Sequence, residues 1–164
     1  MKQEFSGTLD KIRNVSAIDM AKAVNSIDFP LPAGGFVYIF YFADTPFYVG
    51  QADCFQTRMT DYHRKAFASS TDFNVGEAAA YFSSKDYPVK VGYWASEDRY
   101  SEETETIADL VGQGYELLNE KLYYDYRGPK ETRQGRIQQQ RNRVQEFCDS
   151  LIAAHSQRAT TAGN

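Results

Sequence analysis

The residues of this chain that could do chemistry begin with two tyrosine triplets and an arginine. Phe36-Val37-Tyr38 is followed by nine residues, then by Tyr48-Val49-Gly50, and Arg58 comes eight positions after that glycine. The guanidinium of arginine is planar and permanently charged, so it can clamp a phosphate in a way that the point charge of lysine cannot. These residues could therefore act on a phosphate, provided that the fold brings them together.

Two strands are expected to position the triplets. Residues 36–43 form a β-branched and aromatic run, which is typical of a strand buried on both faces. Asp44-Thr45-Pro46 is turn chemistry and residues 47–49 resume the strand pattern, so the triplets should face each other across a hairpin. A four-residue turn would put Tyr38 and Tyr48 on opposite faces of the sheet. A common site therefore requires an odd-length connection or a β-bulge.

A helix after the second triplet is expected to carry Arg58. Gly50 lets the backbone approach a neighbour closely or change direction. Asp53 can cap the helix, and Gln56 can reach back to complete a capping box. The apolar stripe of this helix comprises Phe55, Met59, Tyr62 and Ala66. Arg58 lies one turn before Tyr62, at the edge of the buried face, and should point towards the hairpin.

A later helix is expected to add a carboxylate. Residues 89–94 alternate as a strand does, and Ser101 can cap the helix that follows. The first turns of this helix carry three glutamates, namely Glu102, Glu103 and Glu105. Glu103 alone shares a face with Ile107 and Leu110, so it alone should point at the protein body.

Together these motifs resemble the GIY-YIG nuclease family, which cuts phosphodiester bonds in DNA with a metal ion. The resemblance covers about residues 35–119, although Phe36 stands where the family has its first glycine. The metal-binding glutamate of the family is followed four residues later by an aliphatic residue, as Glu103 is followed by Ile107. The asparagine of the family comes near the end of the same unit, as Asn119 does.

The resemblance implies a role for each candidate catalytic residue. Tyr38 would activate the attacking water, Tyr48 would help to position the water or the phosphate, and Arg58 would hold the scissile phosphate. Tyr62 stands four residues after the arginine, where family members often have histidine or tyrosine. Glu103 would bind Mg²⁺ or Mn²⁺, and one carboxylate suffices because such a cation keeps several water ligands. A tyrosine of ordinary pKa is a poor base at neutral pH, so the metal and Arg58 must favour the phenolate of Tyr38.

Candidate substrate-binding residues extend beyond the catalytic set. They are Gly50, His63, Asn119, Arg127, Lys130 and Arg133. A net charge of -4 is unusual for a protein that must hold nucleic acid, but the segment from Lys121 to Arg143 carries seven basic residues and three tyrosines. We expect this segment to contact the phosphates or bases of DNA. The alternative is the solvated face of a C-terminal helix.

Each candidate also has a purely structural interpretation. Tyr38 and Tyr48 could be strand aromatics of the core, and Arg58 could be a surface residue. Glu103 could favour the positive end of a helix dipole, and a histidine such as His63 is more often a partly exposed helix residue than a catalyst. Two other functions therefore stay open: a catalytically inactive GIY-YIG-like module that binds nucleic acid or a protein, and a structural protein whose tyrosines only pack. The order and spacing of the residues favour the functional interpretation, which the resemblance implies is a metal-dependent DNA endonuclease.

Composition excludes several other classes of protein. With 164 residues, 42% hydrophobic and 15% aromatic, the chain can bury one good core. Cys54 and Cys148 lie far apart without metal-type spacing, so a disulfide framework or a zinc site is not expected. The absence of a long apolar segment predicts no membrane span and favours a cytoplasmic protein, although export without a cleaved signal would leave the same pattern.

The predicted fold is of the α/β (α+β) class. A small, mainly antiparallel three-stranded central sheet is flanked by helices, with an additional C-terminal helix. We divide the chain into an N-terminal helical extension (1–33), a GIY-YIG-like nuclease core (34–127), and a C-terminal helix and tail (128–164), which together form one compact domain. The C-terminal helix should start near Thr132 and end before a disordered tail at residues 160–164. It could cover the sheet of a monomer or pair with a second copy in a homodimer, and the first arrangement is favoured.

Overall fold

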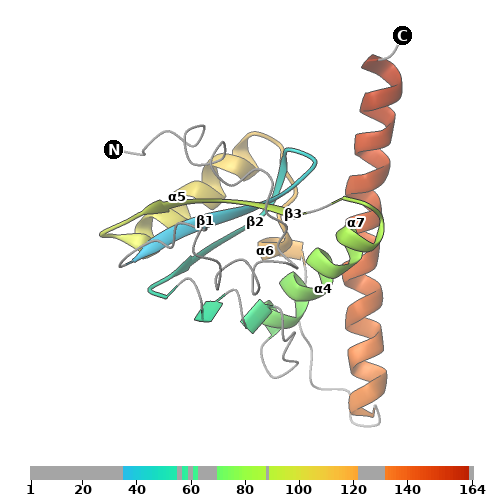
Figure 1. Ribbon diagram of the computed structural model, residues 1–164, viewed down its shortest axis with the longest axis horizontal. Coiled ribbons are helices and arrows are strands. Elements are labelled where there is room, and N and C mark those ends of the chain that lie inside the picture. Colours follow the sequence, from blue (N-terminus) through green and yellow to red (C-terminus); the bar gives the residue numbers. More distant parts are fainter. Residues whose placement is uncertain are drawn as a thin grey trace.

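A three-stranded antiparallel sheet forms the centre of the molecule, as the sequence predicted (Figure 1). The computed structural model describes residues 35–54, 57–58, 61–62, 70–87, 89–121 and 132–162. The strand order is β2-β1-β3, with β1 (Phe36–Phe42) between β2 (Thr45–Ala52) and β3 (Val89–Ala95). Both neighbours run antiparallel to β1, so the central strand is paired along both edges.

The hairpin between β1 and β2 contains the irregularity that a common site requires. Its turn consists of Ala43 and Asp44, which have φ values of 45° and 66°. Positive φ at both central residues is typical of the two-residue hairpin turns that match the twist of the strands. The turn thus comes one residue before the predicted Asp44-Thr45-Pro46, and Thr45 and Pro46 already belong to β2. Phe40 pairs with Tyr48 but Tyr41 pairs with Pro46, which leaves Phe47 as an extra residue in a bulge. The bulge shifts the register, and it places the Tyr48 side chain on the face of Tyr38.

Every residue of β1 is buried, because helices cover both faces of the sheet. One face carries Phe36, Tyr38, Phe40 and Phe42, against which α4 (Ser70–Ser84) and α7 (Arg133–Ala162) pack. The other face carries Val37, Ile39 and Tyr41 against α5 (Arg99–Gly112) and the chain just before α6 (Leu118–Lys121). Figure 1 shows α5 above the sheet and α4 below it.

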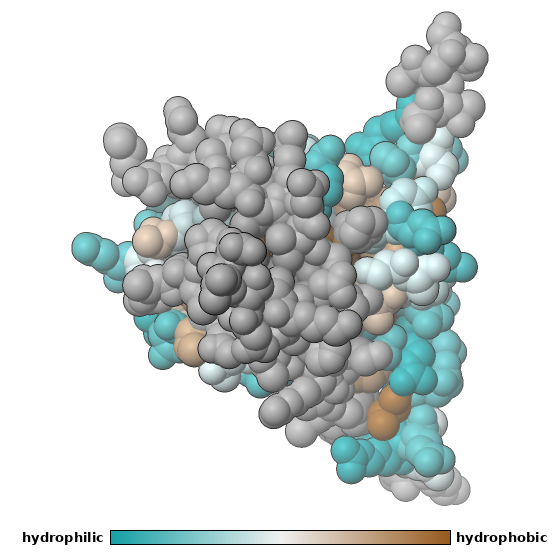
Figure 2. Space-filling model, viewed as in Figure 1, coloured by the Kyte–Doolittle hydropathy of each residue, from teal (hydrophilic) through white to brown (hydrophobic). Residues whose placement is uncertain are grey.

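Helix α7 begins where the sequence predicted and packs within the chain. The Thr132 Oγ1 atom accepts a hydrogen bond of 3.0 Å from the Gly135 backbone N–H, which is an N-cap contact. Val144, Phe147 and Leu151 are buried in the core, and Figure 2 shows mostly hydrophilic residues along the outer side of the helix. The tail predicted from residue 160 was wrong for residues 160–162, which are helical because no glycine or proline interrupts residues 136–162.

Helix α4 was not predicted from the sequence. Several predicted features lie outside the described residues, namely the N-terminal extension, His63, Arg127 and Lys130. Within the described ranges, no helix is long and apolar enough to cross a membrane.

Candidate functional site

Tyr38 and Gly50 lie directly opposite each other in the β1–β2 ladder. A Cβ atom at position 50 would overlap the ring of Tyr38, so only glycine leaves room for that ring. The close approach predicted at Gly50 is therefore confirmed, and the neighbour is Tyr38. Gly50 does not itself line the cleft described below, although it was a candidate substrate-binding residue.

Three tyrosine hydroxyl groups meet at the end of this ladder. The Tyr38 and Tyr62 hydroxyls are hydrogen-bonded, and Tyr62 also donates to the Tyr48 hydroxyl at 3.4 Å. Each tyrosine hydroxyl has a single proton and can also accept, and either oxygen can be the donor between Tyr38 and Tyr62. At most 7% of any of the three residues is exposed. The cluster therefore forms a connected chain of hydroxyls inside the protein.

Burial controls the acidity of these hydroxyls. It raises the pKa of Tyr38 and of Tyr62 well above the ordinary value, and it raises the pKa of Tyr48 as well. The positive charge of Arg58 lowers the pKa of each tyrosine, but this effect is smaller than that of burial. All three tyrosines are thus neutral at physiological pH, and a phenolate at Tyr38 requires further positive charge.

Arg58 lies over the tyrosine cluster. Its Nε–H donates to the Tyr62 hydroxyl at 3.1 Å, and its guanidinium carbon lies 4.5 Å from the centre of the Tyr62 ring. The Nη1 atom is 2.9 Å from Oδ1 of Asp72 in the first turn of α4 and 3.8 Å from Asp61. Burial alone would lower the pKa of Arg58, but Tyr62, Tyr38 and Asp72 raise it, so the guanidinium stays charged.

Residues 57 and 58 are helical, and the Arg58 backbone N–H donates to the carbonyl oxygen of Cys54 at 3.1 Å. Residues 55 and 56, on which the predicted cap by Asp53 and Gln56 depends, lie outside the described residues. The Sγ atom of Cys54 is 3.2 Å from Oγ1 of Thr57. Tyr62 is buried, as the predicted stripe required.

Glu103, on α5, lines the same cleft as Arg58 and the tyrosines Tyr38 and Tyr48, although α5 packs on the other face of the sheet. A cleft of about 540 Å³ is lined by Tyr38, Tyr48, Arg58 and Glu103, together with residues 51–54. Burial raises the pKa of the Glu103 carboxyl, whereas the charge of Arg58 lowers it. Among the described residues, no hydrogen bond or ion pair engages this carboxylate.

Two predictions about this helix were wrong. Helix α5 begins at Arg99 after the N-cap Asp98, so Ser101 lies inside the helix and does not cap it. Glu103 is also not the only glutamate that faces the protein, because Glu102 accepts a 2.8 Å hydrogen bond from Nε1 of Trp94. A long side chain at the edge of an apolar stripe can reach a polar partner on the sheet, which helical periodicity alone does not reveal. Glu105 is exposed.

Asn119 holds the edge strand of the sheet. Its Oδ1 accepts from the Val49 backbone N–H at 3.0 Å, and its Nδ2 donates to the Val49 carbonyl at 2.7 Å. The side chain thus completes the backbone hydrogen bonds of β2 between Tyr48 and Gly50. Asn119 does not line the cleft and its described contacts position β2, while its contact with substrate stays a prediction.

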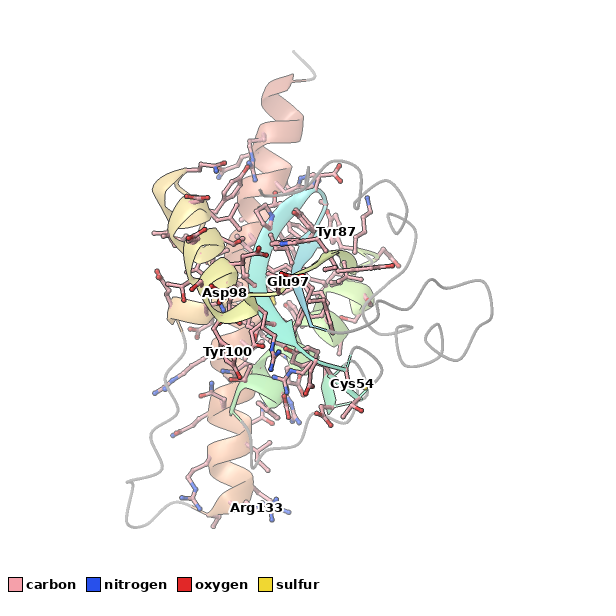
Figure 3. All side chains as sticks on the ribbon, turned by 90° about the vertical axis from the view of Figure 1, so that its left-hand side faces the viewer. Cys54, Tyr87, Glu97, Asp98, Tyr100 and Arg133 are labelled. Atoms are coloured by element: carbon pink, nitrogen blue, oxygen red, sulfur yellow. The ribbon has the colours of Figure 1, made fainter. Side chains whose placement is uncertain are left out.

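The described part of the basic C-terminal segment lies apart from the cleft. Arg133 is the first residue of α7, and Figure 3 places it at the lower end of that helix, away from Cys54 and Tyr100. The Nε–H of Arg141 donates to Oε1 of Glu77 at 3.1 Å, so this arginine joins α7 to α4. Neither arginine lines the cleft.

Sequence reasoning missed several residues of the site, chiefly Asp72, Gln51, Arg99 and Tyr100. Only the acidic first turn of a helix could have drawn attention to Asp72, and that helix was not predicted.

Comparisons with models of protein families, with curated proteins and with solved structures found no match.

Proposed function

We propose that the chain is a metal-dependent DNA endonuclease that hydrolyses phosphodiester bonds through a GIY-YIG-type active site. One observation carries the proposal. Tyr38, Tyr48, Arg58 and Glu103 come from four separate segments, and all four line one cleft above the buried Tyr62. Aromatic residues that only filled a core would not need an arginine and an unpaired carboxylate beside their hydroxyl groups.

The donor set fits a hard divalent cation with few protein ligands. The described residues contain no group of three or more His, Cys, Asp or Glu side chains that could enclose a metal. Mg²⁺ commonly takes one or two carboxylates and keeps several waters, so Glu103 in the open cleft could hold Mg²⁺ or Mn²⁺. When bound there, the cation would supply positive charge to the phosphate and favour deprotonation of the nucleophile.

Arg58 is arranged to hold the scissile phosphate. Its Nε donates to Tyr62 and its Nη1 lies against Asp72, and the guanidinium also interacts with the hydroxyls of Tyr38 and Tyr48. The guanidinium is therefore fixed beside the cleft that it lines, where its positive charge can act on a phosphate oxygen. Lysine could not reproduce this, because it has no second group with which to keep the contacts to Tyr62 and Asp72.

Tyr38 is the candidate general base. In the resting cluster it is hydrogen-bonded to Tyr62, and burial keeps it protonated. When Tyr38 loses its proton to solvent, the Tyr62 hydroxyl can donate to the resulting phenolate, while Arg58 stabilises it by charge. The cluster thus lowers the cost of the base form beside the cleft that Tyr38 lines.

The experiment that tests this function is a cleavage assay with matched glutamate variants. Supercoiled plasmid and single-stranded DNA are incubated with the protein and Mg²⁺, Mn²⁺ or a chelator. We expect cleavage only with metal, and we expect Glu103→Gln to abolish it without loss of folding or DNA binding. The exposed Glu105 provides the control, because Glu105→Gln should cut at the wild-type rate.

Two results would contradict the proposal. Wild-type protein that binds DNA but never cuts it would favour the inactive binding module. A Glu103→Gln variant with wild-type cleavage would remove the metal ligand from the account.

A further inference from the structure

Arg99 and Tyr100 form a second cation–aromatic pair at the rim of the cleft. Both residues line it, and both belong to the first turn of α5, on which Glu103 also lies. Tyr100 is 64% exposed, in contrast to the buried tyrosines of the cluster. Figure 3 shows Tyr100 and Cys54 near the same end of the sheet, where β2 ends and α5 begins. An exposed ring therefore stands beside the residues that would hold the phosphate.

Neutral groups hold Arg99 in place. Its Nε–H donates to Oε1 of Gln51 at 2.7 Å, and its guanidinium carbon lies 5.0 Å from the centre of the Tyr100 ring. A Cβ atom at Gly35 would lie 3.3 Å from Nη1, so the guanidinium also rests against the backbone there. Among the described residues no carboxylate pairs with Arg99, whereas Arg58 is paired with Asp72. The positive charge of Arg99 is thus positioned without being neutralised.

These contacts leave a fixed cation beside an exposed aromatic ring. A side chain that only stabilised the fold would be expected to pair with one of the many acidic residues of this chain, which has a net charge of -4. A fixed cation next to an exposed aromatic ring instead matches the two surfaces of a nucleotide, namely its phosphate and its base.

We propose that Arg99 and Tyr100 bind the nucleotide next to the scissile phosphate, with its base unpaired and stacked on the Tyr100 ring and its phosphate beside Arg99. The inference rests on the proposed nuclease function and adds a substrate class to it. Bases in an intact duplex are stacked on each other and cannot reach such a ring. The preferred substrate therefore contains an unpaired base at the cut site, as single strands, overhangs and gapped duplexes do.

Binding measurements without metal test the subsite separately from catalysis. Fluorescence anisotropy in the presence of a chelator compares a single-stranded oligonucleotide, its perfect duplex, and a duplex with a short single-stranded gap. The wild-type protein should bind the first and third more tightly than the second. Tyr100→Ala should weaken binding to the single strand by about 5- to 140-fold, the range for loss of one stacked base. Tyr100→Phe should retain the affinity because it keeps the ring.

The charge of Arg99 has its own readout. Arg99→Gln should reduce the slope of log affinity against log salt by about 0.7 for single-stranded DNA. The variant loses one phosphate contact, so fewer counterions are released from the DNA on binding. The control is Arg158→Gln, an exposed arginine on α7, which should leave the slope unchanged. Circular dichroism establishes that each variant is folded.

The subsite is overturned if wild-type protein binds the duplex as tightly as the single strand. It is also overturned if folded Tyr100→Ala binds the single strand with wild-type affinity, or if Arg99→Gln leaves the salt slope unchanged. None of these results depends on whether the protein cuts DNA. Conversely, a protein that never cuts in the metal-dependent assay would contradict the nuclease function, whatever these binding data show.

Discussion

The two ends of one face of β1 are equally buried but differ in chemistry. At the hairpin end, Phe42 stacks on Phe82 with ring centres 4.5 Å apart, and Phe47 packs against the same ring. At the other end, the buried Tyr38 and Tyr62 carry hydroxyl groups that bond to each other and lie beside Arg58. Buried hydroxyls and a partly buried charge add little to packing that phenylalanine would not supply. The difference shows that the polar atoms, and not burial, distinguish the candidate site from the core.

Helix α4 connects the two ends. Its first turn provides Asp72 to the ion pair with Arg58, and its last turn provides Phe82 to the aromatic core. Packing of α7 against α4 therefore supports the site from a distance, through contacts such as that between Gln140 and Asn74. Variants at the two ends should separate stability from catalysis.

The largest effect on stability is expected at the hairpin end. Phe82 is fully buried, and Phe82→Ala should lower the free energy of unfolding by about 3–5 kcal/mol because it leaves a cavity beside Phe42 and Phe47. Denaturant unfolding measures this change. Phe82→Leu is the matched control and should cost less, because it fills more of the space. Per folded molecule, Phe82→Ala should still cut DNA, and a selective loss of cleavage would break the comparison.

A smaller, graded effect is expected from pH at the tyrosine end. Burial raises the pKa of Tyr38, so its base form is scarce at neutral pH. As long as the pH stays below that pKa, the base form becomes about tenfold more abundant for each unit by which the pH rises. The raised pKa of Glu103 acts in the same direction, because protonation at acidic pH removes its charge. Single-turnover cleavage should therefore rise from about pH 6 to about pH 9. A rate that fell over this range would exclude Tyr38 as the base.

Local patterns in the sequence were enough to predict most of the fold. The aromatic run of β1, the alternation of β3 and the start of α7 near Thr132 were all predicted from short segments. A bulge or an odd-length turn was predicted only because Tyr38 and Tyr48 could not otherwise lie on one face of the sheet. The position of the bulge, at Phe40 and Tyr41, depends on the backbone conformation of the Ala43-Asp44 turn, which the sequence does not reveal. Tyr38, Tyr48, Arg58 and Glu103, which line the cleft, were selected by the resemblance in motif spacing and not by local structure.

The features that were missed depend on contacts between distant parts of the chain. Helix α4 buries residues around much of its circumference, so it lacks the single apolar stripe that reveals an amphipathic helix. The roles of Asp72 and Asn119 follow from partners 14 and 70 residues away, Arg58 and Val49, and no local pattern contains that information. Pairing between Arg99 and Gln51 is a contact of the same kind.

The most direct test of the central claim is the single-turnover rate of DNA cleavage by Tyr38→Phe with Mg²⁺. We predict a rate at least about 100-fold below wild type, because the variant keeps the ring over Gly50 but lacks the group that would accept the proton. The free energy of unfolding should change by only about 1–2 kcal/mol, since the ring packing is kept and only the hydroxyl contacts, to Tyr62 and Arg58, are removed. A folded Tyr38→Phe protein that cuts DNA at the wild-type rate would show that the tyrosine end is a core and not an active site.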